Sequence, residues 1–243
     1  MVQGTQTIDS WNKHALCLIP ARAGSKGLPR KNTREFHGRS LLHWTIERAV
    51  ESKIFNEIAV TTDDSEAKKI GKALGVTVLD RPIEFAQDSS LASDYLKYHS
   101  QMIRKFDYMM LLQVTSPLRN TYDIQESFRL LTESNDEDTV LISFTKAGVR
   151  PRTLFFVNQE GYAQSLIQTT ERNRQDEKDL FRVNGAIFAA KTLTLEKLEY
   201  DFLKGKVKSY IMPQERSVDI DTLNDFNRAQ NLFNTEGKIE YEF

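Results

Sequence analysis

The sequence predicts an α/β protein: a doubly wound, mostly parallel sheet with a small inserted arm. The first observation is that short apolar segments of strand length recur along the chain. The second is that they alternate with segments whose apolar residues recur every three to four positions, as in helices. The third is composition, since 243 residues with 40% hydrophobic and 28% charged residues are typical of a folded domain with a sizeable core. In such a sheet the ligand site lies beyond the carboxyl ends of the strands.

The first part of the chain begins the alternation. The continuous apolar run at residues 15–19 predicts a buried strand, and the stretch 20–38, rich in Gly, Pro and basic residues, predicts a long loop. Helical spacing of apolar residues predicts a helix over 40–52, and a strand follows at 56–62. A second helix is expected over 64–74. One strand–helix–strand unit is therefore complete before residue 64.

The same alternation continues to about residue 145. Further strands are expected at residues 76–79, 108–113 and 139–144, and further helices at 93–105 and 121–133. Asn120 precedes the last of these helices and Asp123 takes its third position, a pattern that predicts an N-terminal capping box. Apolar strands within 184–191 and 206–213 and a helix near 222–234 return the chain to the sheet.

The break in this alternation divides the chain. Residues 15–145 and 181–235 form the main domain, 146–180 form an inserted arm, and 1–14 form a loose polar leader to which we assign no function. Because the arm is too short to bury a core of its own, we expect it to dock on a second copy of the chain as a dimerisation arm.

Charge and cysteine content exclude several classes of function. With 33 basic and 34 acidic residues the net charge is −1, which gives no bulk attraction to nucleic acid or to an anionic membrane, so we expect neither partner. No apolar stretch approaches the roughly 20 residues that a membrane helix needs. The single cysteine, Cys17, lies in the apolar run ALCLI and fits a buried, reduced thiol, so we predict a cytoplasmic protein.

The basic loop, PARAGSKGLPRKN at residues 20–32, is the clearest candidate site. Between residues 22 and 39 there are six basic residues and one acid, and the glycines allow backbone N–H groups to approach an anion. This pattern predicts phosphate binding, with a solvated basic loop as the alternative. The loop contains neither GxxxxGK[ST] nor GxGxxG, so it is not a P-loop or a dinucleotide fingerprint.

Polar residues also follow the strand at 108–113, in LLQVTSPLR, where a parallel sheet places its ligands; a Ser-Pro turn before a capped helix is the alternative.

In SVDIDT, Asp219 and Asp221 flank Ile220, so in an extended segment both carboxylates face one way and Ile220 faces the core. The pair suits Mg²⁺, which takes one or two carboxylates plus phosphate oxygens. The alternative is that Asp221 or Thr222 caps the last helix.

Arginines near the arm are candidates for binding a carboxylate. Arg174, and Arg182 with Asn184 in RVNGAIF, offer guanidinium groups that bind carboxylates through paired hydrogen bonds; surface or subunit salt bridges are the alternative.

The four histidines have no spacing suited to zinc, and no GxSxG elbow or Cys/His pattern supports a covalent hydrolase.

Four motifs in this order, ARAGSKGLPRKN, LLQVTSPLR, FRVNGAIF and SVDIDT, resemble the acylneuraminate (sialic acid, or nonulosonic acid) cytidylyltransferases over about residues 15–235. The resemblance implies a Rossmann-like nucleotidyltransferase fold and an enzyme that joins CTP to a nine-carbon 2-keto sugar acid. The products would be a CMP-sugar and pyrophosphate, and the reaction would use Mg²⁺. It also implies a homodimer joined through the arm, in biosynthesis of a cell-surface polysaccharide.

The resemblance also implies roles for individual residues. The nucleotide would be bound by Ala21, Arg22, Ser25, Lys26, Gly27, Lys31, Asn32 and Arg81. The sugar acid would be bound by Gln113, Arg152, Arg174, Arg182 and Asn184. Asp219 and Asp221 would be the metal ligands, and with Arg22 and Lys31 they would be the catalytic residues. The sequence departs from the family at Val114, where Pro is frequent, and at Phe188, where Tyr is common.

Two other functions are compatible with these residues. A 3-deoxy-octulosonate cytidylyltransferase would use the same chemistry on a shorter sugar acid, and its family carries a different glycine loop. A nucleotide-binding regulatory protein could keep the loop without turnover, but it would have no need of both Asp219 and Asp221. For the enzyme, the proton acceptor is either a carboxylate such as Asp221 or a bound hydroxide.

Overall fold

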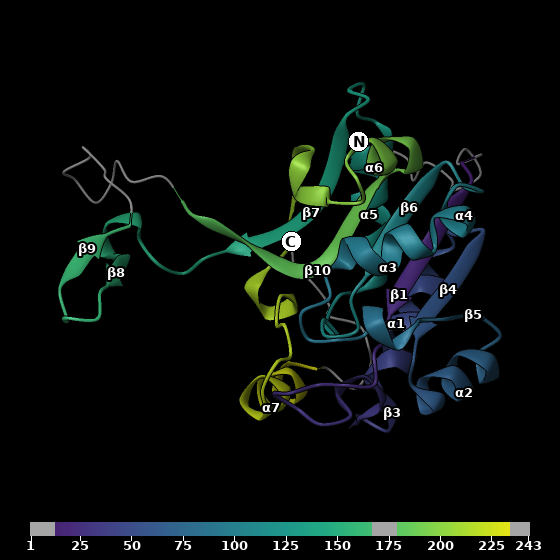
Figure 1. The fold of residues 1–243 in the computed structure, drawn as a ribbon, viewed down its shortest axis with the longest axis horizontal. Helices are drawn as coiled ribbons and strands as arrows, with labels where there is room; N and C mark the ends of the chain where they lie inside the picture. The colour runs from purple at the N-terminus through teal and green to yellow at the C-terminus, as the bar shows by residue number, and fades with distance from the viewer. Residues whose placement is uncertain (1–12, 167–178, 234–243) are drawn as a thin grey trace, which may run out of the picture.

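The computed structural model describes residues 13–166 and 179–233, and at its centre is a seven-stranded sheet (Figure 1). The interior strand β1 (Ala15–Pro20) shows why the sheet forms, since its side chains alternate between two hydrophobic cores. Cys17 contributes to the core on one face, and Leu16 and Leu18 contribute to the core on the other. A strand that is apolar on both faces requires cover on both, which confirms the doubly wound α/β fold.

The strands of this sheet lie in the order β11-β7-β10-β6-β1-β4-β5. Their bounds are β1 (Ala15–Pro20), β4 (Glu57–Thr62), β5 (Thr77–Asp80), β6 (Tyr108–Leu112), β7 (Thr139–Lys146), β10 (Phe181–Lys191) and β11 (Lys206–Ile211). β10 pairs antiparallel with both β6 and β7, and the other neighbouring pairs are parallel. The sheet is therefore mostly parallel, as predicted, and the carboxyl ends of β1, β4 and β6 meet at one edge.

Helices cover both faces. They are α1 (Leu41–Ser52), α2 (Ser65–Ala73), α3 (Ala92–Tyr98), α4 (Ser100–Ile103), α5 (Thr121–Thr132), α6 (Thr192–Lys197) and α7 (Leu223–Leu232). One core is closed by α1, α2, α5 and α7, through residues such as Leu42, Phe128 and Phe226. The opposite core is closed by α3, α4 and α6, through residues such as Leu96 and Leu195.

The predicted capping box at α5 is confirmed. The side chain of Asn120 accepts a hydrogen bond from the backbone N–H of Asp123 at 2.9 Å, and the Asp123 carboxylate accepts one from the N–H of Asn120 at 3.0 Å. The same device begins α7, where Thr222 is the cap and Asp225 is its partner. The cap of the last helix is therefore Thr222 and not Asp221.

Two predicted elements differ from the structure. The stretch 20–38 is not wholly irregular: it contains a 3-10 turn, η2 (Lys31–Thr33), and the two-residue strand β2 (Glu35–Phe36), which pairs with β3 (Arg39–Ser40). The helix expected over 93–105 is two helices, because the backbone leaves helical geometry at His99.

The end of the predicted leader belongs to the body. The ring of His14 stacks on Phe106 at 4.7 Å between ring centroids, and Lys13 donates to the carbonyl of Thr132 at 3.3 Å. Both residues are thereby held against the fold, so the leader assignment was wrong at positions 13 and 14. Residues 1–12 lie outside the described part of the chain.

The arm leaves the sheet between β7 and β10, and Figure 1 shows it extending well away from the body. Its described part contains the turn η4 (Pro151–Thr153) and a hairpin of β8 (Phe155–Val157) and β9 (Ala163–Ser165). Both strands of this hairpin are exposed along their whole length. Among the described helices, none is both long and apolar enough to cross a membrane.

Candidate functional site

A cleft of about 530 Å³ opens at the carboxyl ends of β1 and β6, the edge at which the sheet predicts a ligand site. It is lined by Pro20, Arg22, Ser25, Lys26, Gly27, Lys31, Asn32, Arg81, Ser90, Ala92, Tyr95, Gln113, Val114, Thr115, Asp221 and Thr222. Every predicted nucleotide-binding residue except Ala21 lies in this lining. Ala21 is fully buried, and its N–H donates to the carbonyl of Thr61 at 3.0 Å, so it anchors the loop to β4.

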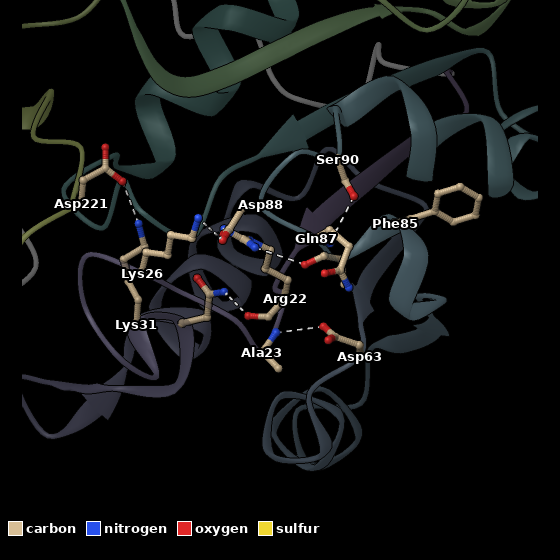
Figure 2. Close-up of polar contacts among 12 residues, drawn as sticks. Arg22, Ala23, Lys26, Lys31, Asp63, Phe85, Gln87, Asp88, Ser90 and Asp221 are labelled. Atoms are coloured by element: carbon tan, nitrogen blue, oxygen red, sulfur yellow. Dashed lines mark hydrogen bonds and ion pairs between the residues drawn. The ribbon is translucent and has the colours of Figure 1, made fainter.

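Two cations of the basic loop, Arg22 and Lys26, converge on the carboxylate of Asp88, as Figure 2 shows. The guanidinium of Arg22 donates to Asp88 at 2.7 Å and to the carbonyl of Ala86 at 3.1 Å. The ammonium of Lys26 lies 2.8 Å from the other oxygen of Asp88. Hydrogen bonds from Lys26 and Arg22 hold the pKa of Asp88 below its ordinary value. The sequence analysis missed Asp88.

The backbone of the basic loop is fixed by close contacts. The buried side chain of Asn32 donates to the carbonyl of Arg22 at 2.9 Å, so Asn32 supports the loop from beneath. The N–H of Ala23 donates to Asp63 at 2.8 Å. A Cβ atom at Gly27 would lie 2.2 Å from the carbonyl oxygen of Asp221, so only glycine allows the loop to pack against the SVDIDT segment.

The segment SVDIDT contributes Asp221, but not Asp219, to the residues that line the cleft. Ile220 is fully buried, and its N–H donates to the carbonyl of Thr115 at 2.8 Å, which fixes the segment beside the end of β6. Asp221 is 73% exposed and forms an ion pair with Lys31 at 2.8 Å. Lys31, predicted as a phosphate contact, therefore forms an ion pair with a predicted metal ligand.

Asp219 differs from Asp221 in its surroundings. Its Oδ1 is buried and has no hydrogen-bond partner within the described residues. Burial raises the pKa of Asp219 and the neighbouring charge of Asp221 adds to this, while the nearby hydroxyl of Thr115 and the charges of Lys31 and Arg182 lower it. Gly185 makes room for this side chain, since a Cβ there would lie 3.2 Å from Oδ2. Asp219 is thus a carboxylate whose pKa is raised by its burial despite the nearby charges of Lys31 and Arg182.

Arg81 and Tyr95 also line the cleft. The Arg81 guanidinium lies 4.2 Å from the centroid of the Tyr95 ring and donates from Nε to the carbonyl of Phe85 at 2.7 Å. Both side chains are buried, which keeps the guanidinium in one orientation. Arg81 was predicted at this site, but Tyr95 was not, because an aromatic residue in an amphipathic helix is read as core.

The predicted sugar-binding residues are not all brought together. Gln113 lines the cleft, and Arg182 is exposed on β10, with its charge acting on Asp219. Arg152 lies in the arm, in η4, apart from the cleft. Arg174 lies outside the described residues.

Asn184 has a different place from the one the prediction requires. Its amide is buried, accepting from Ser143 at 2.6 Å and donating to Ser217 at 2.9 Å and to the sulfur of Met212 at 3.2 Å. The side chain is therefore committed within the protein. It joins β10 to β7 and to the segment that precedes Asp219, so its geometry is that of a support for the site.

A smaller cavity of about 270 Å³ adjoins the cleft, and Ala92 and Gln113 line both. Its other lining residues are mostly apolar: Leu91, Ser93, Leu111, Phe188, Tyr200, Asp201, Phe202 and Leu203. The sequence analysis did not find this cavity, because residues 200–203 reach it only through the fold. The end of β6, carrying Gln113, is the wall between the two spaces.

The polar residues after β6 divide into two groups. Gln113 and Thr115 line the cleft, whereas Ser116 and Arg119 are buried. Arg119 donates to the carbonyl of Gln113 at 3.1 Å and to that of Ala186 at 2.8 Å. It thereby ties the end of β6 to the irregular part of β10, where the pairing register with β7 shifts.

The fold and this cleft together define a class of protein: a Rossmann-like, doubly wound α/β domain whose basic glycine loop and Asp221 face one ligand site. The family model of the cytidylyltransferases matches residues 16–236, which is most of the chain. The chain therefore belongs to the cytidylyltransferase family.

Individual relatives agree with this assignment. An N-acylneuraminate cytidylyltransferase of Streptococcus agalactiae serotype V is 36% identical over 214 residues, covering 87% of this chain and 51% of that protein. The chain thus spans about half the length of such relatives. A pseudaminic acid cytidylyltransferase of Campylobacter jejuni is 26% identical over 239 residues, covering 93% of this chain and 97% of that protein.

A solved structure extends the agreement to the fold. The structure of CMP:2-keto-3-deoxy-manno-octonic acid synthetase complexed with CTP superposes with a TM-score of 0.68 at 19% identity. The superposition covers 90% of this chain and 98% of that one.

Proposed function

We propose that the chain transfers the cytidylyl group of CTP to a nine-carbon 2-keto sugar acid, giving a CMP-sugar and pyrophosphate. The observation that carries the proposal is the convergence of the basic loop and the SVDIDT segment on one cleft, where Lys31 and Asp221, 190 residues apart in sequence, are in contact. The names of the relatives from Streptococcus agalactiae and Campylobacter jejuni support the same chemistry. Membership in the cytidylyltransferase family favours CTP as the nucleotide.

In this proposal the basic loop binds the triphosphate. Arg22 and Lys26 present charged donors, which form short, strong hydrogen bonds with phosphate oxygens. Arg81, held against Tyr95, adds a third cation to the lining, and the charge of Arg22 acts on it. The cleft thus has one strongly cationic side, at which a leaving pyrophosphate is stabilised.

The aspartate pair fits a magnesium ion. Oδ1 of Asp219 is a buried oxygen without a hydrogen-bond partner among the described residues, and a divalent cation is the kind of group that would satisfy it. No group of three or more His, Cys, Asp or Glu side chains suited to a metal occurs in the described parts of the chain, so the protein offers two carboxylates at this place. Mg²⁺ commonly takes one or two carboxylates and completes its shell with phosphate oxygens and water.

The reaction follows from these positions. When bound, Mg²⁺ would neutralise charge on the attacked phosphate. The anomeric hydroxyl of the sugar acid attacks the α-phosphorus, the bond from that phosphorus to the bridging oxygen breaks, and pyrophosphate leaves toward Arg22 and Lys26. Asp221 accepts the hydroxyl proton in this scheme, since its carboxylate is exposed at the cleft. No Ser or Cys nucleophile is required, because positioning and electrostatics dominate such transfers.

The sugar acid occupies the space beside Gln113. Arg182 lies near Asp219 and is the exposed guanidinium of the body that we assign to the carboxylate of the sugar. The smaller cavity, with its Phe188, Tyr200 and Phe202 walls, takes the apolar acyl substituents of the sugar. This apolar space favours an acylated nine-carbon acid over a 3-deoxy-octulosonate, which carries no acyl group.

We propose a homodimer as the working form. The hairpin of the arm exposes Phe155, Phe156, Val157 and Tyr162, an apolar surface that no described part of its own chain covers. A second copy supplies the natural cover, and it would bring the arm residue Arg152 to another subunit. The buried thiol of Cys17 fits a cytoplasmic location, which stays a prediction.

A pyrophosphate-release assay tests the proposed reaction. Purified protein with CTP and Mg²⁺ is supplied in parallel with N-acetylneuraminic, legionaminic, pseudaminic and 3-deoxy-octulosonic acids. We expect release with at least one nine-carbon acid, and the preferred acid identifies the substrate. Preferential use of the octulosonic acid would support the alternative enzyme, and CTP binding without turnover on any acid would support the regulatory protein.

A further inference from the structure

Asp88 forms ion pairs with two of the cationic side chains that line the cleft. Each of its two oxygens binds a different cation: Oδ1 binds Arg22 at 2.7 Å and Oδ2 binds Lys26 at 2.8 Å (Figure 2). These distances equal those of guanidinium or ammonium donors to phosphate oxygens. The carboxylate therefore sits where a bridging anion would bind, and two of the three cations of the loop that face the cleft are engaged by it.

The turn that carries Asp88, residues 86–90, does not need its carboxylate. The N–H of Gln87 donates to the hydroxyl of Ser90 at 3.1 Å, and that hydroxyl donates to the carbonyl of Glu84 at 3.0 Å. The N–H of Ser90 donates to the carbonyl of Gln87 at 3.1 Å. The turn is thus closed by its own hydrogen bonds, and the ion pairs of Asp88 are additional to its folding.

Arg22 is held in place by a second contact. Its guanidinium also donates to the carbonyl of Ala86, so loss of the Asp88 charge leaves one anchor for that side chain. The side chain of Lys26 is 82% exposed, so no packing holds its ammonium against Asp88 rather than another anion. Exposed ion pairs of this kind are weak enough to be exchanged for a ligand that carries several negative charges.

We propose that Asp88 is an internal anion that occupies the phosphate position of Arg22 and Lys26 until the triphosphate displaces it. Asp88 then returns to both cations as pyrophosphate leaves, which aids release of that product. The inference rests on the proposed function. Asp88 would lower nucleotide affinity because its carboxylate competes with the phosphates for Arg22 and Lys26. A carboxylate that only preorganised the two cations would have the opposite effect on affinity when it is removed.

Calorimetric titration with inorganic pyrophosphate and with CTP, each without sugar acid, tests this proposal. Asp88→Asn should bind both ligands about 3- to 10-fold more tightly than the wild type, because two exposed ion pairs no longer have to be broken. Asp88→Ala, which also removes the hydrogen bonds, should show the same gain. A gain of affinity is a readout that damage to the fold would not produce.

Asp136→Asn is the matched control. Asp136 forms an exposed ion pair with Lys206 at 2.5 Å, at the end of the sheet away from the cleft, so the variant loses the same charge without touching the basic loop. Its affinities should stay within about 2-fold of the wild type. In a Lys26→Ala background the gain from Asp88→Asn should shrink, since one of the two broken pairs is already absent.

The outcomes separate the two proposals. Wild-type protein that binds neither pyrophosphate nor CTP would overturn both the proposed function and this inference. Wild-type protein that binds both, with Asp88→Asn and Asp88→Ala binding more weakly or equally, would overturn only the competition by Asp88. A gain of the same size in Asp136→Asn would also overturn it, because the effect would then come from net charge.

Discussion

The cleft and the arm differ in how their side chains are partnered within one chain. Charged residues of the cleft pair with each other, whereas large apolar residues of the arm are left exposed. In the cleft Lys31 is paired with Asp221, and Arg22 and Lys26 with Asp88. In the arm the strands β8 and β9 pair only with each other, and the hairpin exposes large apolar side chains. The difference teaches that one chain brings the charged residues of the cleft together, whereas the arm exposes an apolar surface that we propose a second copy covers.

Charge removal from the aspartate pair should have the largest effect and would test the cleft as a chemical site. Asp219→Asn and Asp221→Asn keep the side-chain size but remove the charge that we propose holds Mg²⁺. We expect each to lower turnover at saturating substrates by at least about 100-fold, because metal stabilisation of the attacked phosphate is lost. Turnover measured across a Mg²⁺ series checks this.

Asp225, the capping-box partner of Thr222 at the start of α7, provides the control for that experiment. Asp225 accepts hydrogen bonds from the N–H and hydroxyl of Thr222 at 2.8 and 2.7 Å, so Asp225→Asn should cost about 1 kcal/mol of stability while turnover stays within about 3-fold. If Asp221→Asn behaves like Asp225→Asn, SVDIDT serves only the helix start and the metal-site proposal is wrong.

A charge placed on the arm hairpin tests whether the arm needs a second copy. Phe156 is 64% exposed in the isolated chain, and Phe156→Asp should weaken self-association by about 30-fold or more if this ring is buried between subunits. Light scattering should then shift from about twice the 28.0 kDa chain mass toward the chain mass. Leu193→Asp, at a similarly exposed apolar residue of α6, should change nothing. A wild type with the chain mass at micromolar concentration would contradict the dimer.

The close packing of the basic loop on SVDIDT gives a third, smaller effect. A Cβ at Gly27 would overlap the carbonyl of Asp221, so Gly27→Ala must displace the loop, and we expect CTP affinity to fall about 10-fold. Gly24→Ala is the control, because a Cβ there meets only the end of the Arg22 side chain, at 3.7 Å. Equal affinities of the two variants in a CTP titration would show that this packing does not shape the cleft.

The sequence predicts those parts of the molecule that depend on local pattern. The apolar run of β1, the basic loop and the alternation of Asp219 with Ile220 each follow from neighbouring residues, and each is found where expected. Asp88 could not be found in this way, because its partners lie more than 60 residues away and an exposed Asp in a turn is common.

Asn184 and Arg152 show two other limits. An Asn beside an Arg in a strand has the same sequence pattern whether it faces a ligand or the core, and here the irregular pairing near Gly185 accompanies an inward-facing amide. Arg152 was assigned to the sugar by resemblance alone, and that assignment can be tested only where the arm meets a second copy. A role that depends on contacts between two chains leaves no pattern among neighbouring residues of one chain.

The smallest predicted effect separates the two aspartates by stability. Asp219 is a largely enclosed carboxylate with an unpartnered oxygen and a raised pKa, whereas Asp221 is exposed and paired with Lys31. A carboxyl whose pKa is raised on folding is favourable when protonated and becomes a penalty as the pH rises through that pKa. Without metal at neutral pH, Asp219→Asn should therefore stabilise the protein by on the order of 1 kcal/mol, or about 2 to 4 °C in melting temperature.

The pH dependence of this gain gives the sign of the effect. Below the ordinary aspartate pKa of 3.8 the Asp219 carboxyl is neutral in both the folded and unfolded chain, so the advantage of Asp219→Asn should disappear there. Asp221→Asn should show no such gain at any pH, since it loses an exposed ion pair worth little. Mg²⁺ with CTP should reverse the order at neutral pH, because only the wild type gains stability from a ligand that needs the charge. Thermal melts of the three proteins at several pH values measure this, and a destabilised Asp219→Asn in metal-free buffer would mean that Asp219 is compensated within the fold.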